Sequence, residues 1–161
     1  MSDVLITTIP FAKFDQSPTK LLKEANIEYL INPIGKKPCE DELVDMLSNK
    51  KALIAGTELI TEYVLEKSKE LKFISRVGVG LDSIDLAVAR KKGIIVSYTP
   101  NTPSASVAEL TIGMVLSQLR CIHSSDRDMH NKIWRKHTGR RLGECCVGLI
   151  GIGRIGEKVL E

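Results

Sequence analysis

The sequence predicts an α/β protein built on a parallel sheet with helices on both faces. Three observations support this fold class. Residues 1–98 alternate short apolar runs with helix signals, the order expected for strands joined by crossover helices. Hydrophobic residues make up 43% of the 161 residues, which is enough to build a core. A G-x-G-x-x-G segment stands near residue 151, as in the strand-to-helix turn of a nucleotide-binding unit.

Short apolar runs are predicted to form the strands of this sheet. The runs are Val4–Ile6, Ile27–Ile31, Ala52–Ala55, Leu71–Val77 and Ile94–Val96. Pro33 ends the second run, because proline cannot donate a hydrogen bond to a strand ladder. Gly56 ends the third run at a position that favours a turn.

Helix signals lie between these runs. The helices are expected at residues 17–25, at 40–47, from Thr61 onward and at 84–92. Ser17 followed by Pro18 is typical of a helix start, and Asn26 can end that helix. Gly93 follows the fourth helix, where a left-handed residue commonly ends a helix.

The regular alternation stops at residues 98–103, where two prolines make an extended, stiff connection. We therefore expect one domain over residues 1–98 and the beginning of a second over residues 99–161. Ser106 and Glu109 form the pattern of a capping box at the start of a helix over residues 106–121. Because apolar residues cover much of its circumference, we expect this helix to be buried between domains or subunits.

A glycine turn at residues 151–156 carries the clearest chemical signal. A strand is expected over residues 146–150 and a helix after the turn. Gly151 permits a tight turn, Gly153 lets the backbone approach a pyrophosphate, and Gly156 lets the helix pack closely. The amides at the helix start attract phosphates. The alternative is a glycine-rich turn that binds no ligand.

A second glycine turn, residues 78–80, follows the predicted fourth strand. Ligands of open α/β sheets bind beyond the carboxyl ends of the strands. The amides of Val79 and Gly80 are therefore candidates for a small anion-binding nest that holds a carboxylate. A simple strand-to-helix turn is an equally good interpretation of these residues.

Composition argues against several function classes. The net charge of +3 comes from scattered basic residues, so nucleic-acid binding is not expected. No apolar run approaches the ~18 residues of a membrane span. The chain begins without a basic leader, and reduced cysteines favour the cytoplasm. No cysteine spacing fits a metal site, and Cys145 and Cys146 are expected to be buried at the start of a strand.

Four stretches in a fixed order resemble the D-2-hydroxyacid dehydrogenase family, in particular its phosphoglycerate dehydrogenase-like members. The stretches are Ser75–Asp85, Lys92–Val96, Tyr98–Asn101 with Ser106–Gly113, and Gly148–Gly156. The resemblance covers essentially the whole chain and is weakest over residues 1–50. Four motifs in this order are far more specific than any one of them.

The resemblance implies a flavodoxin-like, doubly wound substrate domain over residues 1–98. The start of a Rossmann dinucleotide-binding domain would follow over residues 99–161. The implied reaction is hydride transfer between C2 of a small 2-hydroxy or 2-keto acid and the nicotinamide of NAD. An acidic ribose-binding residue would lie about 20 residues beyond the glycine turn, so NADP also stays open. A homodimer of the intact protein is implied as well.

The resemblance also implies roles for particular residues. The substrate carboxylate would be held at Gly78, Val79 and Gly80, and Val107 would lie near the nicotinamide. The cofactor pyrophosphate would be held at Gly151, Gly153, Arg154, Ile155 and Gly156. No metal is implied.

The chain departs from the family pattern in two respects. The family's catalytic arginine, acidic residue and histidine follow the glycine turn, so no catalytic residue is expected in this chain. The histidines His123, His130 and His137 precede the turn and are expected to be solvated. Residues 55–58 also lack the basic group that meets the substrate phosphate in some phosphoglycerate dehydrogenases, which puts 3-phosphoglycerate in doubt.

Three functions stay open. The first is an NAD-dependent dehydrogenase of which this chain is an incomplete part that is inactive alone. The second is a non-catalytic module that binds a small acid or a partner, and the third is a regulator on the same fold. The coding sequence after codon 161 separates the first two. An in-frame histidine and ribose-binding acidic residue would favour the enzyme, and a stop codon would favour the module.

Overall fold

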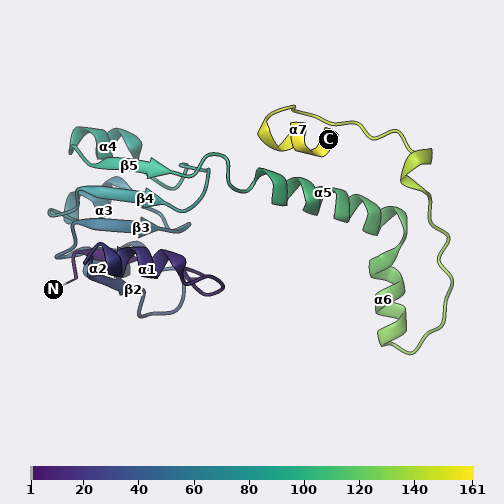
Figure 1. Cartoon of the computed structure of the whole chain (residues 1–161), viewed down its shortest axis with the longest axis horizontal. Coiled ribbons are helices and arrows are strands. Elements are labelled where there is room, and N and C mark those ends of the chain that lie inside the picture. The colour runs from purple at the N-terminus through teal and green to yellow at the C-terminus, as the bar shows by residue number, and fades with distance from the viewer. Residues whose placement is uncertain (1) are drawn as a thin grey trace. The chain divides into compact units, whose positions relative to one another are not determined.

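The computed structural model describes residues 2–161, which form two compact units that divide after Pro100. Figure 1 shows the first unit around a sheet and the second built of helices. The boundary falls close to the predicted break after residue 98. The assignment of the units to substrate and nucleotide remains a prediction.

The first unit contains a five-stranded parallel sheet in the order β2-β1-β3-β4-β5. The strands are β1 (Val4–Ile6), β2 (Tyr29–Ile31), β3 (Ala52–Ala55), β4 (Phe73–Arg76) and β5 (Ile95–Tyr98). This is the flavodoxin-like order of a doubly wound sheet, so the predicted fold class is confirmed. All five predicted strands are present, with ends that shift by up to two residues.

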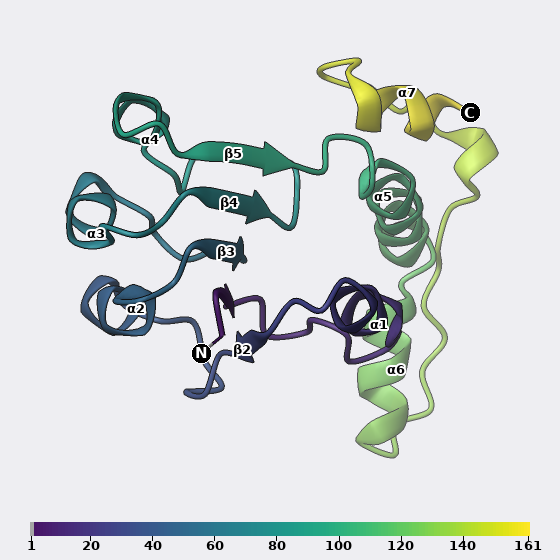
Figure 2. The same ribbon diagram turned by 60° about the vertical axis from the view of Figure 1, so that its left-hand side comes forward.

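Helices cover both faces of the sheet, as predicted. They are α1 (Ser17–Glu24), α2 (Glu40–Leu47), α3 (Glu62–Lys67) and α4 (Leu86–Lys91). Strand β2 lies on one side of β1, whereas β3 to β5 lie on the other. Right-handed crossovers in opposite directions place their helices on opposite faces. Figure 2 shows this result, with α1 on one face and α2, α3 and α4 on the other.

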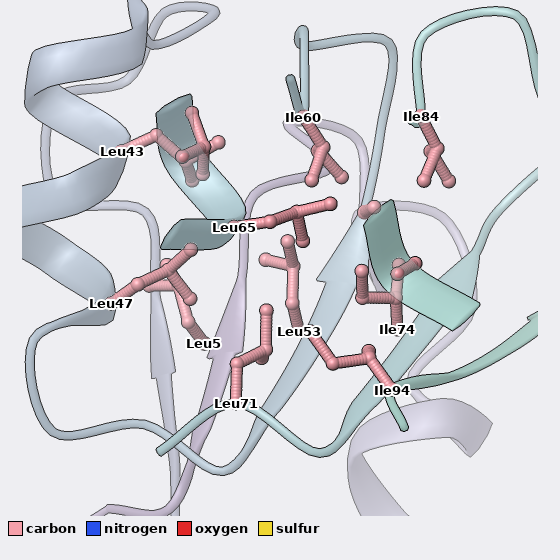
Figure 3. Close-up of a cluster of buried hydrophobic side chains, with 13 residues drawn as sticks. Leu5, Leu43, Leu47, Leu53, Ile60, Leu65, Leu71, Ile74, Ile84 and Ile94 are labelled. Carbon is pink, nitrogen blue, oxygen red and sulfur yellow. The ribbon is translucent and has the colours of Figure 1, made fainter. Parts of the chain in front are cut away.

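The core lies between the sheet and helices α2, α3 and α4 (Figure 3). Leu53 of β3 and Ile74 of β4 point from the sheet into this cluster. Leu43 and Leu65 reach it from the helices, and both are fully buried. Each such side chain contributes roughly 1.5–3 kcal/mol through burial, so this layer is the main source of stability in the unit.

Local signals fix several helix ends. The Cys39 amide donates to Glu42 Oε2 at 2.9 Å at the start of α2, and this capping box was not predicted. Asp85 Oδ1 accepts the Val88 amide at 3.0 Å and caps α4. Asn26 and Gly93 follow their helices with φ of +53° and +70°, which confirms their predicted role as terminators.

The second unit consists of α5 (Ser104–Leu119), α6 (Ile122–His130), a short 3₁₀ helix (Leu142–Glu144) and α7 (Arg154–Leu160). The predicted capping box at Ser106 is wrong, because α5 already begins at Ser104. Proline suits a helix entrance since it lacks an amide hydrogen. The helix therefore starts directly after Pro103, and the Ser104 hydroxyl donates to the Asn101 carbonyl at 3.0 Å.

The strand predicted at residues 146–150 does not form. No strand occurs among residues 101–161 for it to pair with, and a single strand has no ladder of hydrogen bonds. The predicted burial of the adjacent cysteines is consequently wrong as well. Cys146 is exposed and Cys145 is half-buried.

Helix α5 is apolar, but within the described residues only Ala108 of this helix is buried. Leu110 is 62% exposed and Met114 is 58% exposed. Its burial by another subunit remains a prediction. Among residues 2–161, no single helix is both long and apolar enough to cross a bilayer. Helices α5 and α6 meet that criterion only as a pair bent by 66°.

One histidine differs from expectation. His123 and His130 are exposed, as predicted, whereas His137 is half-buried. Its Nε2 atom lies 2.9 Å from Oδ2 of the buried Asp128 on α6. This contact fastens the segment after α6 back onto that helix.

Replacing Leu53 with alanine tests the position of the core. Leu53 is fully buried at the centre of the sheet, so L53A is expected to lower the free energy of unfolding by about 2–5 kcal/mol. Urea unfolding of the chain measures this change. The control L21A truncates a side chain that is 65% exposed and should cost less than about 0.5 kcal/mol. Equal losses in the two variants would contradict the placement of the core.

A pH-dependent contribution comes from Glu42. The Cys39 amide, and then Lys36, hold the pKa of the Glu42 carboxyl below its usual value. Because this pKa is lower in the folded state, the ionised carboxyl stabilises the fold at pH values above its unfolded-state pKa of about 4.3. This stabilisation is lost as the pH falls through the folded-state pKa. E42Q should therefore be less stable than wild type at pH 7, with the difference disappearing in acid. E70Q, at an exposed position, is the control. If E42Q lowered the stability equally at all pH values, the contribution of the Glu42 charge would be contradicted.

Candidate functional site

The turn at residues 78–80 is held firmly at the end of β4. The Val77 amide donates to the Ala55 carbonyl at 2.9 Å and continues the pairing with β3. The Gly78 amide donates to Thr99 Oγ1 at 2.9 Å, and the Gly78 carbonyl accepts the Thr99 amide at 3.0 Å. Gly78 has φ of +140°, a conformation that favours glycine. The turn is therefore fixed to the residue that follows β5, and the residue before the turn is fixed to the end of β3.

Two amides of this turn are open. Within residues 2–161, the amides of Val79 and Gly80 donate to no acceptor of the protein, and both residues are exposed. Of the three predicted substrate-binding residues, only Gly78 has its amide occupied, by Thr99. Successive open amides after a strand can bind a carboxylate. The geometry is consistent with the predicted role of Val79 and Gly80, which stays a prediction.

A cavity of about 330 Å³ lies beside this turn. Its polar side chains come from residues that end three strands or follow them and from the loop before α2: Thr7, Thr8, Lys37, Thr57, Glu58 and Arg76. Val77 also lines the cavity and connects it to the 78–80 turn. We call this space the edge cavity. It occupies the carboxyl edge of the parallel sheet, where ligands of such folds bind.

A buried carboxylate lies at the edge cavity. Glu58 is 2% exposed, and both of its carboxylate oxygens accept the Gly56 amide at 3.1 Å. The Thr7 hydroxyl donates to the same carboxylate. Because Thr7 follows β1 and Gly56 follows β3, Glu58 fastens the carboxyl ends of these two strands together.

Two polar atoms of the edge cavity lack a partner. Thr8 Oγ1 and Arg76 Nε are buried and form no hydrogen bond with the described residues. The Arg76 guanidinium does donate through Nη1 to the Val77 carbonyl. Buried polar atoms are normally hydrogen-bonded, so these two atoms are exceptions among the residues that line the cavity.

Sequence reasoning missed the cations of this cavity. Residues 55–58 lack a basic group, as the sequence shows, but the fold brings Lys37 and Arg76 to the same place. Arg76 ends β4 two residues before Gly78, and a basic residue so close to a glycine turn is a usable signal. Lys37 lies in a loop without any local signal for a site.

Two glycines shape the turn at residues 151–156. Gly151 has φ of +91°, which L side chains rarely adopt. A Cβ atom on Gly156 would lie 2.5 Å from the Gly151 carbonyl oxygen, so this close approach requires glycine. The predicted close packing of Gly156 is thus present, but against the turn itself and Leu149 rather than against a strand.

The start of α7 offers open amides. Gly153 precedes the helix, and a Cβ atom there would meet no protein atom within 4 Å. The Glu157 amide donates to the Gly153 carbonyl at 2.9 Å, and this hydrogen bond closes the first turn of the helix. The preceding amides, those of Arg154 and Ile155 included, have no intrahelical partner. These residues fit a diphosphate group, and their role stays a prediction.

Val107 is half-buried on α5, where its carbonyl accepts the Thr111 hydroxyl at 2.7 Å. Its predicted place near the nicotinamide is untested and stays a prediction. Within residues 2–161, no group of three histidine, cysteine or acidic side chains is arranged to hold a metal ion.

Comparison with known proteins places this geometry in context. The catalytic-domain model of the D-isomer specific 2-hydroxyacid dehydrogenases matches residues 4–154. D-3-phosphoglycerate dehydrogenase of Methanocaldococcus jannaschii is 38% identical over 126 residues, which cover 76% of this chain and 24% of that protein. Hydroxypyruvate reductase of Thermotoga maritima is 37% identical over 125 residues, covering 76% of this chain and 41% of the relative.

The fold comparison agrees with the sequence comparison. A crystal structure from Polaromonas sp. JS6 66, described as an NAD-binding D-isomer specific 2-hydroxyacid dehydrogenase, superposes with a TM-score of 0.80 at 25% identity. The match covers 99% of this chain and 51% of that one. The chain thus spans between about a quarter and a half of the length of these three proteins. Since the family model matches nearly all of the chain, the chain belongs to the D-isomer specific 2-hydroxyacid dehydrogenase family.

Proposed function

We propose that the protein acts as an NAD-dependent oxidoreductase of small D-2-hydroxy acids. The observation that carries this proposal is the turn at residues 151–156. Its backbone is forced by the positive φ of Gly151 and by the close approach of Gly156, and it leaves the amides of α7 open. A turn of this shape before a helix suits the pyrophosphate of a dinucleotide.

The proposed roles follow from the open backbone groups. Gly153, Arg154 and Ile155 present amides to the pyrophosphate, while Gly151 and Gly156 shape the turn. The bound dinucleotide supplies the nicotinamide that accepts or donates the hydride. Val107 lies beside that ring in this proposal.

The substrate is held at the other glycine turn in this proposal. Amides of Val79 and Gly80 bind the carboxylate of the 2-hydroxy or 2-keto acid and so orient its C2 atom. Gly78 gives the turn its shape through its positive φ. A second copy of the protein is the proposed partner, and the exposed apolar side chains of α5 are its proposed contact.

NAD is the proposed cofactor. The Polaromonas relative is described as NAD-binding, which supports a nicotinamide dinucleotide for this family member as well. The residue that would select NAD over NADP is expected about 20 residues after the glycine turn. Both cofactors therefore belong in the assay.

The activity is tested on the whole product of the gene that encodes this chain. That product should reduce NAD with at least one D-2-hydroxy acid and not with its L-enantiomer, as followed by absorbance at 340 nm. The 161-residue chain alone should show no turnover, because the family's catalytic residues follow the glycine turn. Turnover by the chain alone would contradict this account. A gene product that ends at Glu161 and is inactive would support the non-catalytic module.

Substitution at Gly153 tests the dinucleotide turn. G153A should raise the KM for NAD of the active product at least about fivefold, since overpacking costs ~1–3 kcal/mol. The melting temperature should hardly change, because φ of −99° suits any residue and the added Cβ atom meets no protein atom. G143A, also in open space, is the control. An unchanged KM for NAD in G153A would show that the pyrophosphate does not bind at this turn.

A further inference from the structure

We infer that Thr99 is a positioning residue for the acid, because its hydroxyl holds Gly78 in the conformation that turns the Val79 and Gly80 amides toward a carboxylate. This inference rests on the proposed function, since it assumes that the acid's carboxylate binds at those two amides. Thr99 acts through the turn in this account and does not contact the acid itself.

The register of the sheet brings Thr99 to the turn. Arg76, the last residue of β4, pairs with Tyr98, the last residue of β5. Thr99 is therefore the first residue beyond the paired strands, and it lies beside the 78–80 turn. Pro100 follows and disfavours helical backbone at Thr99, which makes Thr99 a stiff anchor. The anchor and the turn both belong to the first unit, which ends at Pro100.

Two hydrogen bonds orient the peptide planes on both sides of Gly78. The Gly78 amide donates to Thr99 Oγ1 at 2.9 Å, which orients the plane before Gly78. The Thr99 amide donates to the Gly78 carbonyl at 3.0 Å, which orients the plane after it. That second plane includes the Val79 amide, and in a planar trans peptide this N–H points opposite to the Gly78 carbonyl. The pair of bonds thus sets the direction of the first open amide.

The turn has little stiffness of its own. Two of its three residues are glycines, which have the widest backbone freedom of all residues, and Gly78 has φ of +140°. Ordering such a backbone costs conformational entropy. A turn that is already ordered does not lose this entropy when the acid binds, so its affinity for the carboxylate is higher. The Thr99 hydroxyl therefore raises the affinity from outside the contact.

The contribution of the hydroxyl can be separated from that of the backbone. T99V removes the hydroxyl but keeps the branched shape of the side chain and the backbone amide that donates to the Gly78 carbonyl. Because Thr99 is exposed, this variant should keep the stability of the fold. T99S restores the hydroxyl. The control T102V removes the hydroxyl of an exposed threonine in the second unit.

The test titrates the isotope-labelled 161-residue chain with oxamate, an analogue of a 2-keto acid, and records amide spectra. Oxamate should shift the amides of Val79 and Gly80 in the wild type. T99V should bind oxamate about three- to fivefold more weakly, because one hydrogen bond no longer favours the binding conformation of the turn. T99S and T102V should bind it as tightly as the wild type does.

Hydrogen exchange without ligand checks that the change is confined to the turn. The Gly78 amide should exchange faster with deuterated water in T99V than in the wild type or T99S, because it has lost its acceptor. The Val77 amide donates to the Ala55 carbonyl and should exchange at the same rate in all variants.

The outcomes separate this inference from the proposed function. If oxamate shifts Val79 and Gly80 but binds T99V as tightly as the wild type, the inference is overturned and the proposed function stays intact. The same holds if T99S binds as weakly as T99V, if Gly78 exchange is unchanged in T99V, or if Val77 exchange rises with it. If oxamate shifts neither Val79 nor Gly80 in the wild type, the proposed carboxylate site and the inference both fail.

Discussion

Parallel pairing of β1 with β3, and of β3 with β4, is the constraint on which the candidate site depends. The pairing is in register along all three strands, so their carboxyl ends stop at one edge of the sheet. Residues that are far apart in the sequence meet there. Thr7, Gly56 and Arg76 then line one cavity, and the 78–80 turn begins where β4 ends. If a single strand ran antiparallel, its loop would lie at the opposite edge and the cavity would not exist.

The carboxylate of Glu58 strengthens this edge. It accepts hydrogen bonds from groups that follow β1 and β3, so the two loops cannot separate without leaving a buried charge unpaired. The same carboxylate shares the cavity lining with two cationic side chains, Lys37 and Arg76.

Sequence reasoning succeeded where the signal is local and failed where it depends on tertiary contacts. The range 40–47 was predicted with the bounds that α2 has, since acidic residues mark its first turn. The prediction of a strand at residues 146–150 was wrong, because a strand forms only when another strand pairs with it. Lys37 and Arg76 were missed as cavity residues since only the sheet order brings their loops together. The two glycine turns were located correctly because steric demands on single residues are readable in the sequence, although their ligands are proposals.

In the second unit, the steric demands of single glycines are enough to shape a turn. Gly151 and Gly156 give the turn its shape although the segment before it forms no strand. The shape of the turn is therefore set within a few residues rather than by the strand that precedes it in complete dinucleotide-binding units. The 78–80 turn differs in this respect, because Thr99 and Ala55, from other strands and loops, hold it in place.

A crystal structure of the whole gene product with NAD and oxamate, an unreactive 2-keto acid analogue, tests the central claim most directly. The account predicts carboxylate oxygens at about 2.7–3.2 Å from the amides of Val79 and Gly80, and pyrophosphate oxygens at similar distances from those of Arg154 and Ile155. A carboxylate bound away from residues 78–80, or a pyrophosphate away from residues 151–156, would contradict it.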